Sequence, residues 1–242
     1  MRKKIIFSYD GSKFNGLQRQ KNTRTVQKTI EEALSKIFED DIELKASGRT
    51  DAGVHAVSQV AHFDIKKDIK GLKHKLNLLL NPDIVVKSVS NVNDDFHARL
   101  SVKKKEYVYK INIGPFKSSL NCYYYQPRQK LDFALMKDAS KVFLGTHDFN
   151  NFISGTNDKT VTTIYEINFV KKFDNKIEVH FIGTGFYRYM IRNLMGALLE
   201  VGKYNTSKED LLKMLDTIEE KSLPTAPPEG LYLYKVWYWE LF

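Results

Sequence analysis

Segments with strand-like and helix-like patterns alternate along this chain, and the same alternation occurs in both of its halves. Residues 3–9 alternate as a strand, and residues 25–38 carry an apolar stripe at helical spacing, with Thr25 in position to cap the helix. Elements that each have one apolar face must bury it against a neighbour. The order of elements therefore predicts an α+β fold of two halves, with antiparallel sheets covered by helices.

The predicted elements divide the chain near residue 100. Residues 1–100 form an N-terminal α+β half and residues 101–242 a C-terminal α+β half, and we expect a functional site between them. In the first half we predict strands at 3–9, 42–46, 57–65 and 84–92, and helices at 25–38 and 68–80. In the second half we predict strands at 101–113, 121–125, 160–171, 176–183 and 231–239, and helices at 132–143, 186–202 and 207–220.

The composition argues against several kinds of site. Cys122 is the only cysteine, so an intramolecular disulfide and a cysteine-rich zinc site are impossible, and the histidines lack H-E-x-x-H spacing. We therefore expect no bound metal. No stretch approaches the roughly 18 unbroken apolar residues of a spanning helix. The apolar run after Lys4 also ends too early for a signal peptide, so we expect a cytoplasmic protein without membrane contact.

Positive charge is concentrated in the first part of the chain. The formal net charge is +9. Residues 1–110 contain 22 Lys and Arg against 14 Asp and Glu, whereas residues 111–242 contain 16 against 15. Such a field favours a polyanionic partner and speeds its capture. A basic surface that only aids solubility would have the same composition, so charge alone does not choose between the two.

The segment from Gly48 to Ala56 reads GRTDAGVHA and is the most specific in the chain. It lies between two predicted strands, and its glycines allow a tight turn and the close approach of a ligand. The turn presents the carboxylate of Asp51 two residues from the guanidinium of Arg49. On these residues alone an ordinary surface turn is the favoured interpretation, because Gly and Asp are common in turns.

Residues 186–199 predict a helix that is apolar on nearly every side and therefore largely buried. Arg188 and Arg192 are four residues apart and would share one face of it. No acidic residue occurs between residues 178 and 200, so a buried arginine here needs a partner from a distant part of the chain. We name Asp51 as that partner. The alternative is that both arginines lie on an exposed face and bind phosphate or nothing.

Residues 103–110 read KKKEYVYK and interleave basic with aromatic side chains. On a strand, Tyr107 and Tyr109 point to one face, with Lys105 alongside. This pattern suits RNA, because rings stack on unstacked bases while lysines meet phosphates. The alternative is a half-buried strand whose tyrosines pack in the core, which we expect for one of the two.

Together these segments resemble the TruA family of tRNA pseudouridine synthases. The stretch from Gly48 to His55 is highly specific to that family. Weaker matches occur along the whole chain in the family's order, at residues 9–11, 18–20, 25–27, 59–63, 96–99, 145–149, 190–193 and 227–231. The chain departs from the family's pattern at Leu17, where tryptophan is usual, at Thr162, where arginine is common, and at Tyr187, which replaces leucine or valine.

The resemblance implies an enzyme that isomerises uridine to pseudouridine at positions 38, 39 and 40 in the anticodon stem-loop of tRNA. It also implies the pseudouridine synthase fold with an RNA cleft between its halves, a homodimer, and no cofactor. By the same resemblance Asp51 is the catalytic aspartate and Arg192 is the arginine that pairs with it. Arg49 would help to hold the place of the displaced base, and Tyr107 would stack on the target uracil.

The reaction breaks the bond from C1′ of the ribose to N1 of uracil and remakes it at C5. The uridine must leave its stack. A carboxylate such as Asp51 could then attack C1′ or remove a sugar proton, and the sequence leaves both routes open. An adjacent Arg192 would lower the pKa of this carboxyl group and orient it.

Two other functions stay open on the residues alone. An RNA-binding protein without catalysis would share the basic charge and the fold. A glycoside hydrolase would need two carboxylates roughly 5–10 Å apart. The adjacent pairs Asp40–Asp41 and Asp94–Asp95 are better explained as residues of solvated turns.

Overall fold

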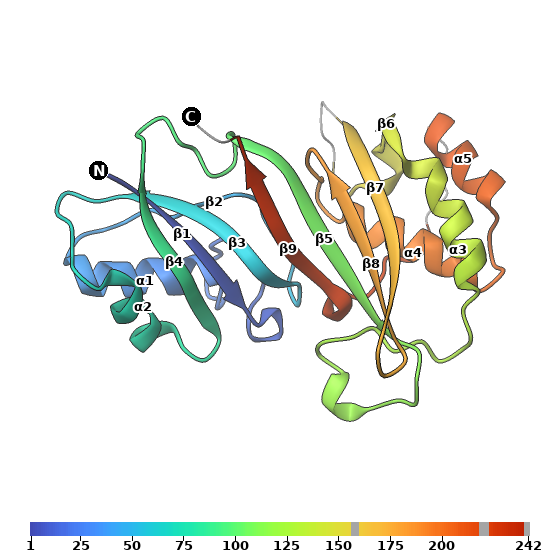
Figure 1. Ribbon diagram of the computed structural model, residues 1–242, viewed down its shortest axis with the longest axis horizontal. Helices are drawn as coiled ribbons and strands as arrows, with labels where there is room; N and C mark the ends of the chain where they lie inside the picture. The colour runs from blue at the N-terminus through green and yellow to red at the C-terminus, as the bar shows by residue number, and fades with distance from the viewer. Residues whose placement is uncertain (156–159, 218–222, 240–242) are drawn as a thin grey trace. The chain divides into compact units, whose positions relative to one another are not determined.

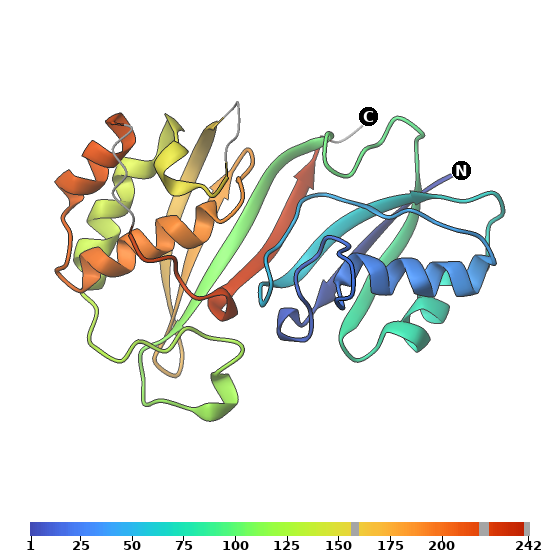
Figure 2. The same ribbon diagram turned by 180° about the vertical axis from the view of Figure 1, so that it is seen from behind.

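The protein consists of two compact units in a computed structural model, which describes residues 1–155, 160–217 and 223–239. Unit 1 comprises Met1–Lys103 and Leu233–Phe242, and unit 2 comprises Lys104–Tyr232. The predicted α+β class is confirmed, because each unit combines antiparallel strands with helices (Figures 1 and 2). The division predicted from sequence instead assigned the whole last strand to the C-terminal half.

The sheet of unit 1 has the strand order β4–β1–β3–β9, and the short β2 pairs with β3. β1 pairs antiparallel with both β3 and β4. The boundary between the two units falls within β9, and only the residues of this strand from Leu233 onward belong to unit 1. The bounds are β1 (Arg2–Tyr9), β2 (Lys45–Ala46), β3 (His55–Asp64), β4 (Ile84–Val92) and β9 (Leu231–Tyr238).

The two helices of unit 1 cover one face of its sheet (Figures 1 and 2). They are α1 (Val26–Phe38) and α2 (Leu72–Leu80). Thr25 occupies the N-cap position of α1, but its side chain makes no capping hydrogen bond. The side chains of β1 are alternately buried and partly exposed, as expected for a strand with one covered face. The buried residues Val60, Phe96 and Ala98 form a hydrophobic cluster. Partly buried side chains, among them Ile6 and Tyr238, pack against this cluster.

The sheet of unit 2 has the order β5–β8–β7–β6. The helices α3, α4 and α5 lie on one side of it (Figures 1 and 2). The register of β5 with β8 places Tyr107 opposite Phe181 and Tyr109 opposite Val179, and all four side chains are buried. The bounds are β5 (Val102–Asn112), β6 (Gly145–Asp148), β7 (Val161–Lys172), β8 (Lys176–Gly183), α3 (Phe133–Ala139), α4 (Met190–Gly202) and α5 (Lys208–Asp216).

Several predicted elements differ from the structure. Residues 121–125 form turns with one isolated bridge at Tyr125, not a strand. The strand predicted at 42–46 is reduced to Lys45–Ala46, and the short edge strand β6 was not predicted. The end of the helix predicted at 207–220 lies outside the described residues. No helix in the described part of the chain is long and apolar enough to span a membrane.

Candidate active site

The loop that carries Asp51 connects β2 to β3 and is held at its start by Gln59. The amide of this side chain donates to the carbonyl of Gly48 at 3.1 Å, and its Oε1 accepts from the hydroxyl of Ser47 at 2.6 Å. Gln59 and Ser47 are both fully buried. A buried β3 side chain therefore fixes where the chain leaves the sheet.

Thr50 anchors the middle of the loop from both its side chain and its backbone. Its hydroxyl shares a hydrogen bond of 2.8 Å with the phenol of Tyr9 on β1. Its carbonyl accepts from the backbone N–H of Leu17 at 3.1 Å. Gly16 is at φ +86°, and a β-carbon there would lie 2.8 Å from the same carbonyl. The close approach of these two backbones thus requires glycine at this position.

A second backbone contact holds the end of the loop. The N–H of Val54 donates to the carbonyl of Asp51 at 3.1 Å and closes the turn. A β-carbon at Gly11 would lie 2.1 Å from the carbonyl of Val54. The N–H of Gly11 also donates to Nδ1 of His55, which is buried, at 3.0 Å. The motif at residues 9–11 therefore supports the Asp51 loop, a role that sequence analysis did not assign.

Asp51 itself is half-buried, whereas Arg49 is exposed. The loop thus presents a partly shielded carboxylate beside a solvent-exposed guanidinium. Burial raises the pKa of the supporting Tyr9 phenol to about 12, so this group stays a neutral hydrogen-bonding partner of Thr50 at physiological pH.

Tyr107 lies on β5 in unit 2 and is 7% exposed. Its ring meets Phe186 edge-on, with 5.4 Å between the ring centroids and 87° between the planes. Tyr109 is fully buried, and its hydroxyl donates to the carbonyl of Pro227 at 2.9 Å. The expectation that one of the two tyrosines packs in the core is confirmed for Tyr109.

Arg192 lies in the first turn of α4, whereas Arg188 precedes the helix. The predicted helix starts late because Tyr189 adopts left-handed backbone angles, with φ 61° and ψ −7°. The two arginines therefore do not share a helix face as predicted. Both guanidinium groups instead lie over the ring of Tyr189, at 5.2 Å for Arg188 and 4.9 Å for Arg192.

Residues 224–227 pack against α4 and orient Arg192. Its Nε donates to the carbonyl of Ala226 at 2.8 Å, and its own backbone carbonyl accepts from the Ala226 N–H at 3.0 Å. A β-carbon at Gly196 would lie 1.9 Å from the carbonyl of Pro224, so the segment lies directly against the helix. Because Nε is used in this bond, the orientation of the guanidinium is restricted.

Glu229 is a charged neighbour of Arg192 that sequence analysis did not single out. Burial raises the pKa of its carboxyl group, and the positive charge of Arg192 opposes that rise. Arg192 is therefore near enough to act electrostatically on an acidic residue of its own unit. The pairing of Arg192 with Asp51, which belongs to unit 1, stays a prediction.

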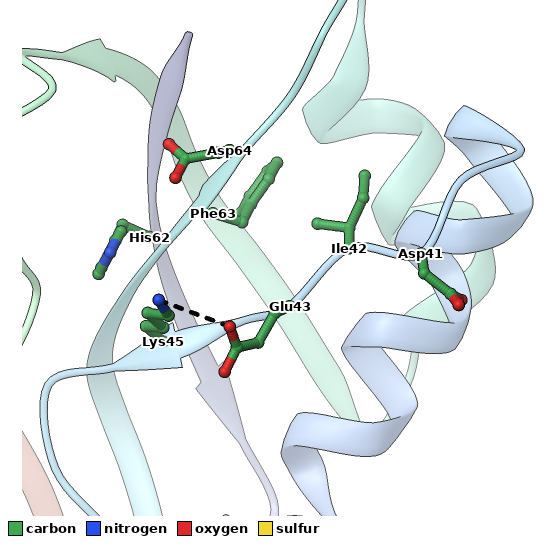
Figure 3. A pocket seen from close by; sticks show the side chains of 7 residues that line it. All are labelled: Asp41, Ile42, Glu43, Lys45, His62, Phe63 and Asp64. Atoms are coloured by element: carbon green, nitrogen blue, oxygen red, sulfur yellow. Dashed lines mark ion pairs between the residues drawn. The ribbon is translucent and has the colours of Figure 1, made fainter.

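A polar pocket of about 230 Å³ lies elsewhere in unit 1 (Figure 3). It includes His62 and the ion pair of Lys45 with Glu43 at 3.5 Å. None of the four predicted site residues lines it. Within the ranges that the structure describes, no group of three or more His, Cys, Asp or Glu side chains is arranged to hold a metal ion.

Comparison with known proteins now identifies the family. A family model described as tRNA pseudouridine synthase matches residues 5–100 and 139–238. This chain belongs to the tRNA pseudouridine synthase family. Curated relatives named tRNA pseudouridine synthase A include one from Listeria monocytogenes serotype 4a, 42% identical over 98% of this chain and 99% of the relative. Another, from Acetivibrio thermocellus, is 40% identical over 97% and 98%.

As a member of this family the chain is an isomerase that converts uridine to pseudouridine in tRNA. A solved structure entitled "Crystal structure of the archaeal box H/ACA sRNP Nop10-Cbf5 complex" overlaps 82% of this chain and 43% of its own, with a TM-score of 0.38 and 12% identity.

The departures from the family's pattern are all accommodated locally. Leu17 is buried, the hydroxyl of Thr162 donates to Gly185 O at 2.8 Å, and that of Tyr187 donates to Val161 O at 3.1 Å.

Proposed function

We propose that this enzyme acts on uridines 38, 39 and 40 of the anticodon stem-loop of tRNA, with Asp51 as its catalytic carboxylate. The observation that carries the proposal is the way the loop presents Asp51. Thr50 and Val54 fix the backbone on both sides of it, and the side chain is half-buried. Such fixed placement is what a group acting on a ribose carbon needs.

The reaction is balanced without an oxidant or a reductant. The bond from C1′ to N1 breaks, the bond from C1′ to C5 forms, C5 loses a proton and N1 carries one in the product. This balance supports the proposal that no cofactor takes part. Asp51 would either attack C1′ or remove a sugar proton, and in both routes it must be ionised.

The other predicted site residues take their roles from the family resemblance. Tyr107 would stack on the target uracil, and Arg49, whose side chain is exposed, would occupy the place that the displaced base leaves. Arg192 would pair with Asp51 and lower the pKa of its carboxyl group. We further propose that the enzyme is a homodimer and works in the cytoplasm on tRNA. Light scattering of the purified protein would test the dimer.

Replacing Asp51 by asparagine tests the catalytic assignment. Asp51→Asn keeps the size and shape of the side chain but removes the charge and replaces one acceptor oxygen by a donor NH2 group. We expect pseudouridine formation in unmodified tRNA to fall by at least about 10³-fold, because a covalent or basic role requires the carboxylate. Carbodiimide labelling followed by primer extension measures the product and its position, and filter binding measures tRNA affinity.

The matched control is Asp40→Asn, which removes an equal charge from an exposed ion pair with Lys66. We expect full activity from it, since exposed ion pairs contribute little. Loss of tRNA binding together with activity in Asp51→Asn would show that the residue is structural. Binding of tRNA without any product in the wild-type enzyme would instead favour an RNA-binding protein without catalysis.

A further inference from the structure

An aromatic side chain projects into solvent where β7 turns into β8 in unit 2. The turn consists of Phe173, Asp174 and Asn175, and the phenyl ring of Phe173 is 96% exposed. Asp174 and Asn175 adopt left-handed angles, with φ 63° and 55°. Both residue types tolerate that conformation, so the turn is formed without any need to bury its aromatic residue. A ring held out in this way is available to a partner.

A second exposed aromatic residue lies on the loop beside this turn. The N–H of Ile113 donates to the carbonyl of Asn175 at 2.8 Å, which fixes the loop after β5 against the turn. Figures 1 and 2 show the end of β5 and the β7–β8 turn next to each other. This loop carries Phe116, which is 68% exposed, followed by the exposed Lys117.

Hydrogen bonds hold this loop in one conformation. The Oε1 atom of Gln126 accepts from the backbone N–H of Lys117 and from the side chain of Asn112, both at 2.9 Å. The amide of Gln126 donates in return to the carbonyl of Lys117 at 2.9 Å. Phe116 and Lys117 are therefore presented by an ordered loop, and little conformational entropy would be lost when they contact a partner.

An apolar groove of about 420 Å³ begins at the same end of the sheet. Phe133 and Phe169 form part of its walls together with Ile113, which also belongs to the loop. Lys137 and Lys171 line the same groove. We call Phe116, Lys117, Phe173 and this groove with its two lysines the turn-end surface.

The turn-end surface carries positive charge that the described residues do not neutralise. Lys172 is paired with Glu178 at 3.1 Å and Lys176 with Asp174 at 3.7 Å. By contrast, no carboxylate of the described residues lies within 4.0 Å of the ammonium groups of Lys117, Lys137 or Lys171. Exposed rings next to lysines that have no carboxylate partner in the described ranges suit a partner that has both π-faces and negative charge.

We propose that the turn-end surface binds a segment of tRNA away from the uridine that is isomerised. Bases of that segment would stack on Phe116 and Phe173 or enter the groove, while phosphates would meet the lysines. Tyr107 lies five residues before the end of β5, a distance of roughly 17 Å along the strand. The reacting nucleotide at Tyr107 therefore cannot itself reach this surface. The inference rests on the proposed function, because it takes tRNA as the substrate.

The test compares two double variants with the wild-type enzyme on full-length tRNA. Phe116→Ser with Phe173→Ser removes the rings, and Lys137→Gln with Lys171→Gln removes two charges at the groove. We expect each pair to raise KM and the dissociation constant for tRNA by about tenfold and to leave kcat unchanged. The lysine pair should also reduce the slope of log affinity against log salt by about 2.

The matched control is Lys73→Gln with Lys213→Gln, which removes the same charge at two exposed lysines of α2 and α5. Equal effects of the control and the groove variants would overturn the proposal, because they would reflect net charge alone. A fall in kcat without a change in KM would also overturn it. So would a loss of self-association measured by light scattering, which would mark the surface as an interface between copies of the chain.

The binding measurement separates this proposal from the proposed function. If the wild-type enzyme forms no pseudouridine but the ring and groove variants still lose tRNA affinity, the proposed function fails and the turn-end surface stands. If the wild-type enzyme is active and both double variants bind tRNA as it does, the turn-end surface fails and the proposed function stands.

Discussion

At the residue scale, two hydrogen bonds of Thr50 hold the Asp51 loop in place. Its hydroxyl bonds to Tyr9 and its carbonyl bonds to the N–H of Leu17. Both partners lie more than 30 residues earlier in the chain. The backbone next to the Asp51 carboxylate is thus held by contacts of its neighbour Thr50 with distant parts of the chain. An active group placed in this way need not reorganise during the reaction.

Tyr107 supplies a ring, and we expect the ring to be sufficient for activity. Tyr107→Phe keeps the edge-on contact with Phe186 and the face on which a base can stack, so pseudouridine formation should stay within about threefold of wild type. Tyr107→Leu is the control that removes the ring, and it should lose about 10- to 100-fold, as expected for one stacked base. An inactive Tyr107→Phe would assign the phenolic hydroxyl a part in the chemistry.

His62 makes the stability of unit 1 sensitive to acid. It is 1% exposed, and its Nδ1 accepts from the N–H of Ala98 at 3.1 Å. Burial is the largest cause that lowers the pKa of His62 to about 4; the charges of the neighbouring His97 and Arg2 act in the same direction, and Asp64 opposes them. In the unfolded chain the pKa is about 6.5. The unfolded state therefore binds the proton more readily between these values, and stability decreases as pH falls from about 6.5 towards 4.

The corresponding experiment is urea denaturation at pH 7, 5.5 and 4.5. We expect the wild-type free energy of unfolding to lose roughly 2 kcal/mol across this range from His62 after allowance for solvent screening. His62→Gln should be less stable at pH 7 and should depend less steeply on pH. The exposed His74→Gln is the control and should follow the wild-type curve. Parallel curves for wild type and His62→Gln would contradict the assignment.

At the scale of elements, residues 224–227 pack against α4 and are hydrogen-bonded to it. The late start of α4 follows from the left-handed Tyr189, and the first turn then binds the segment through Ala226. Gly196 allows the close approach of Pro224. The orientation of Arg192 therefore depends on a stretch of chain more than 30 residues later.

Tyr109→Phe tests whether β5 helps to hold this segment. The substitution removes the hydrogen bond from Tyr109 to the carbonyl of Pro227 and keeps the buried ring. We expect a loss of about 1–2 kcal/mol in the free energy of unfolding and a lower kcat with little change in KM. Tyr204→Phe, which removes an exposed hydroxyl bonded to Asp132, should change neither quantity. An unchanged kcat in Tyr109→Phe would show that the segment does not position Arg192.

At the scale of the whole molecule, the two charged groups of the proposed chemistry belong to different units. If Arg192 pairs with Asp51, it lowers the pKa of that carboxyl group. Arg192→Gln should then raise that pKa and move the acid limb of the kcat–pH profile up by about 1–2 pH units. Arg188→Gln is the control and should leave the limb in place. Reduced activity with an unmoved limb would contradict the pairing.

Elements with a strong pattern were predictable from local sequence. Residues 84–92 form a strand at the predicted bounds, and the apolar stripe of α1 was recognised to within one residue. The short β6 has no such pattern, because three of its four residues are polar and the fourth is glycine. The stretch at 121–125 reads as a strand because it is rich in tyrosine. In the structure it forms turns, whose Tyr123 carbonyl accepts from Tyr232.

By itself the sequence determined the α+β class, the family and the identity of the candidate catalytic loop, because these depend on local patterns and on one highly specific motif. Only the tertiary structure decided that Tyr9, Gly11 and Gly16 build the Asp51 loop and that residues 224–227 orient Arg192. The physical reason is that these contacts are hydrogen bonds and close approaches between segments far apart in the chain. No local pattern encodes which distant carbonyl a given N–H will meet.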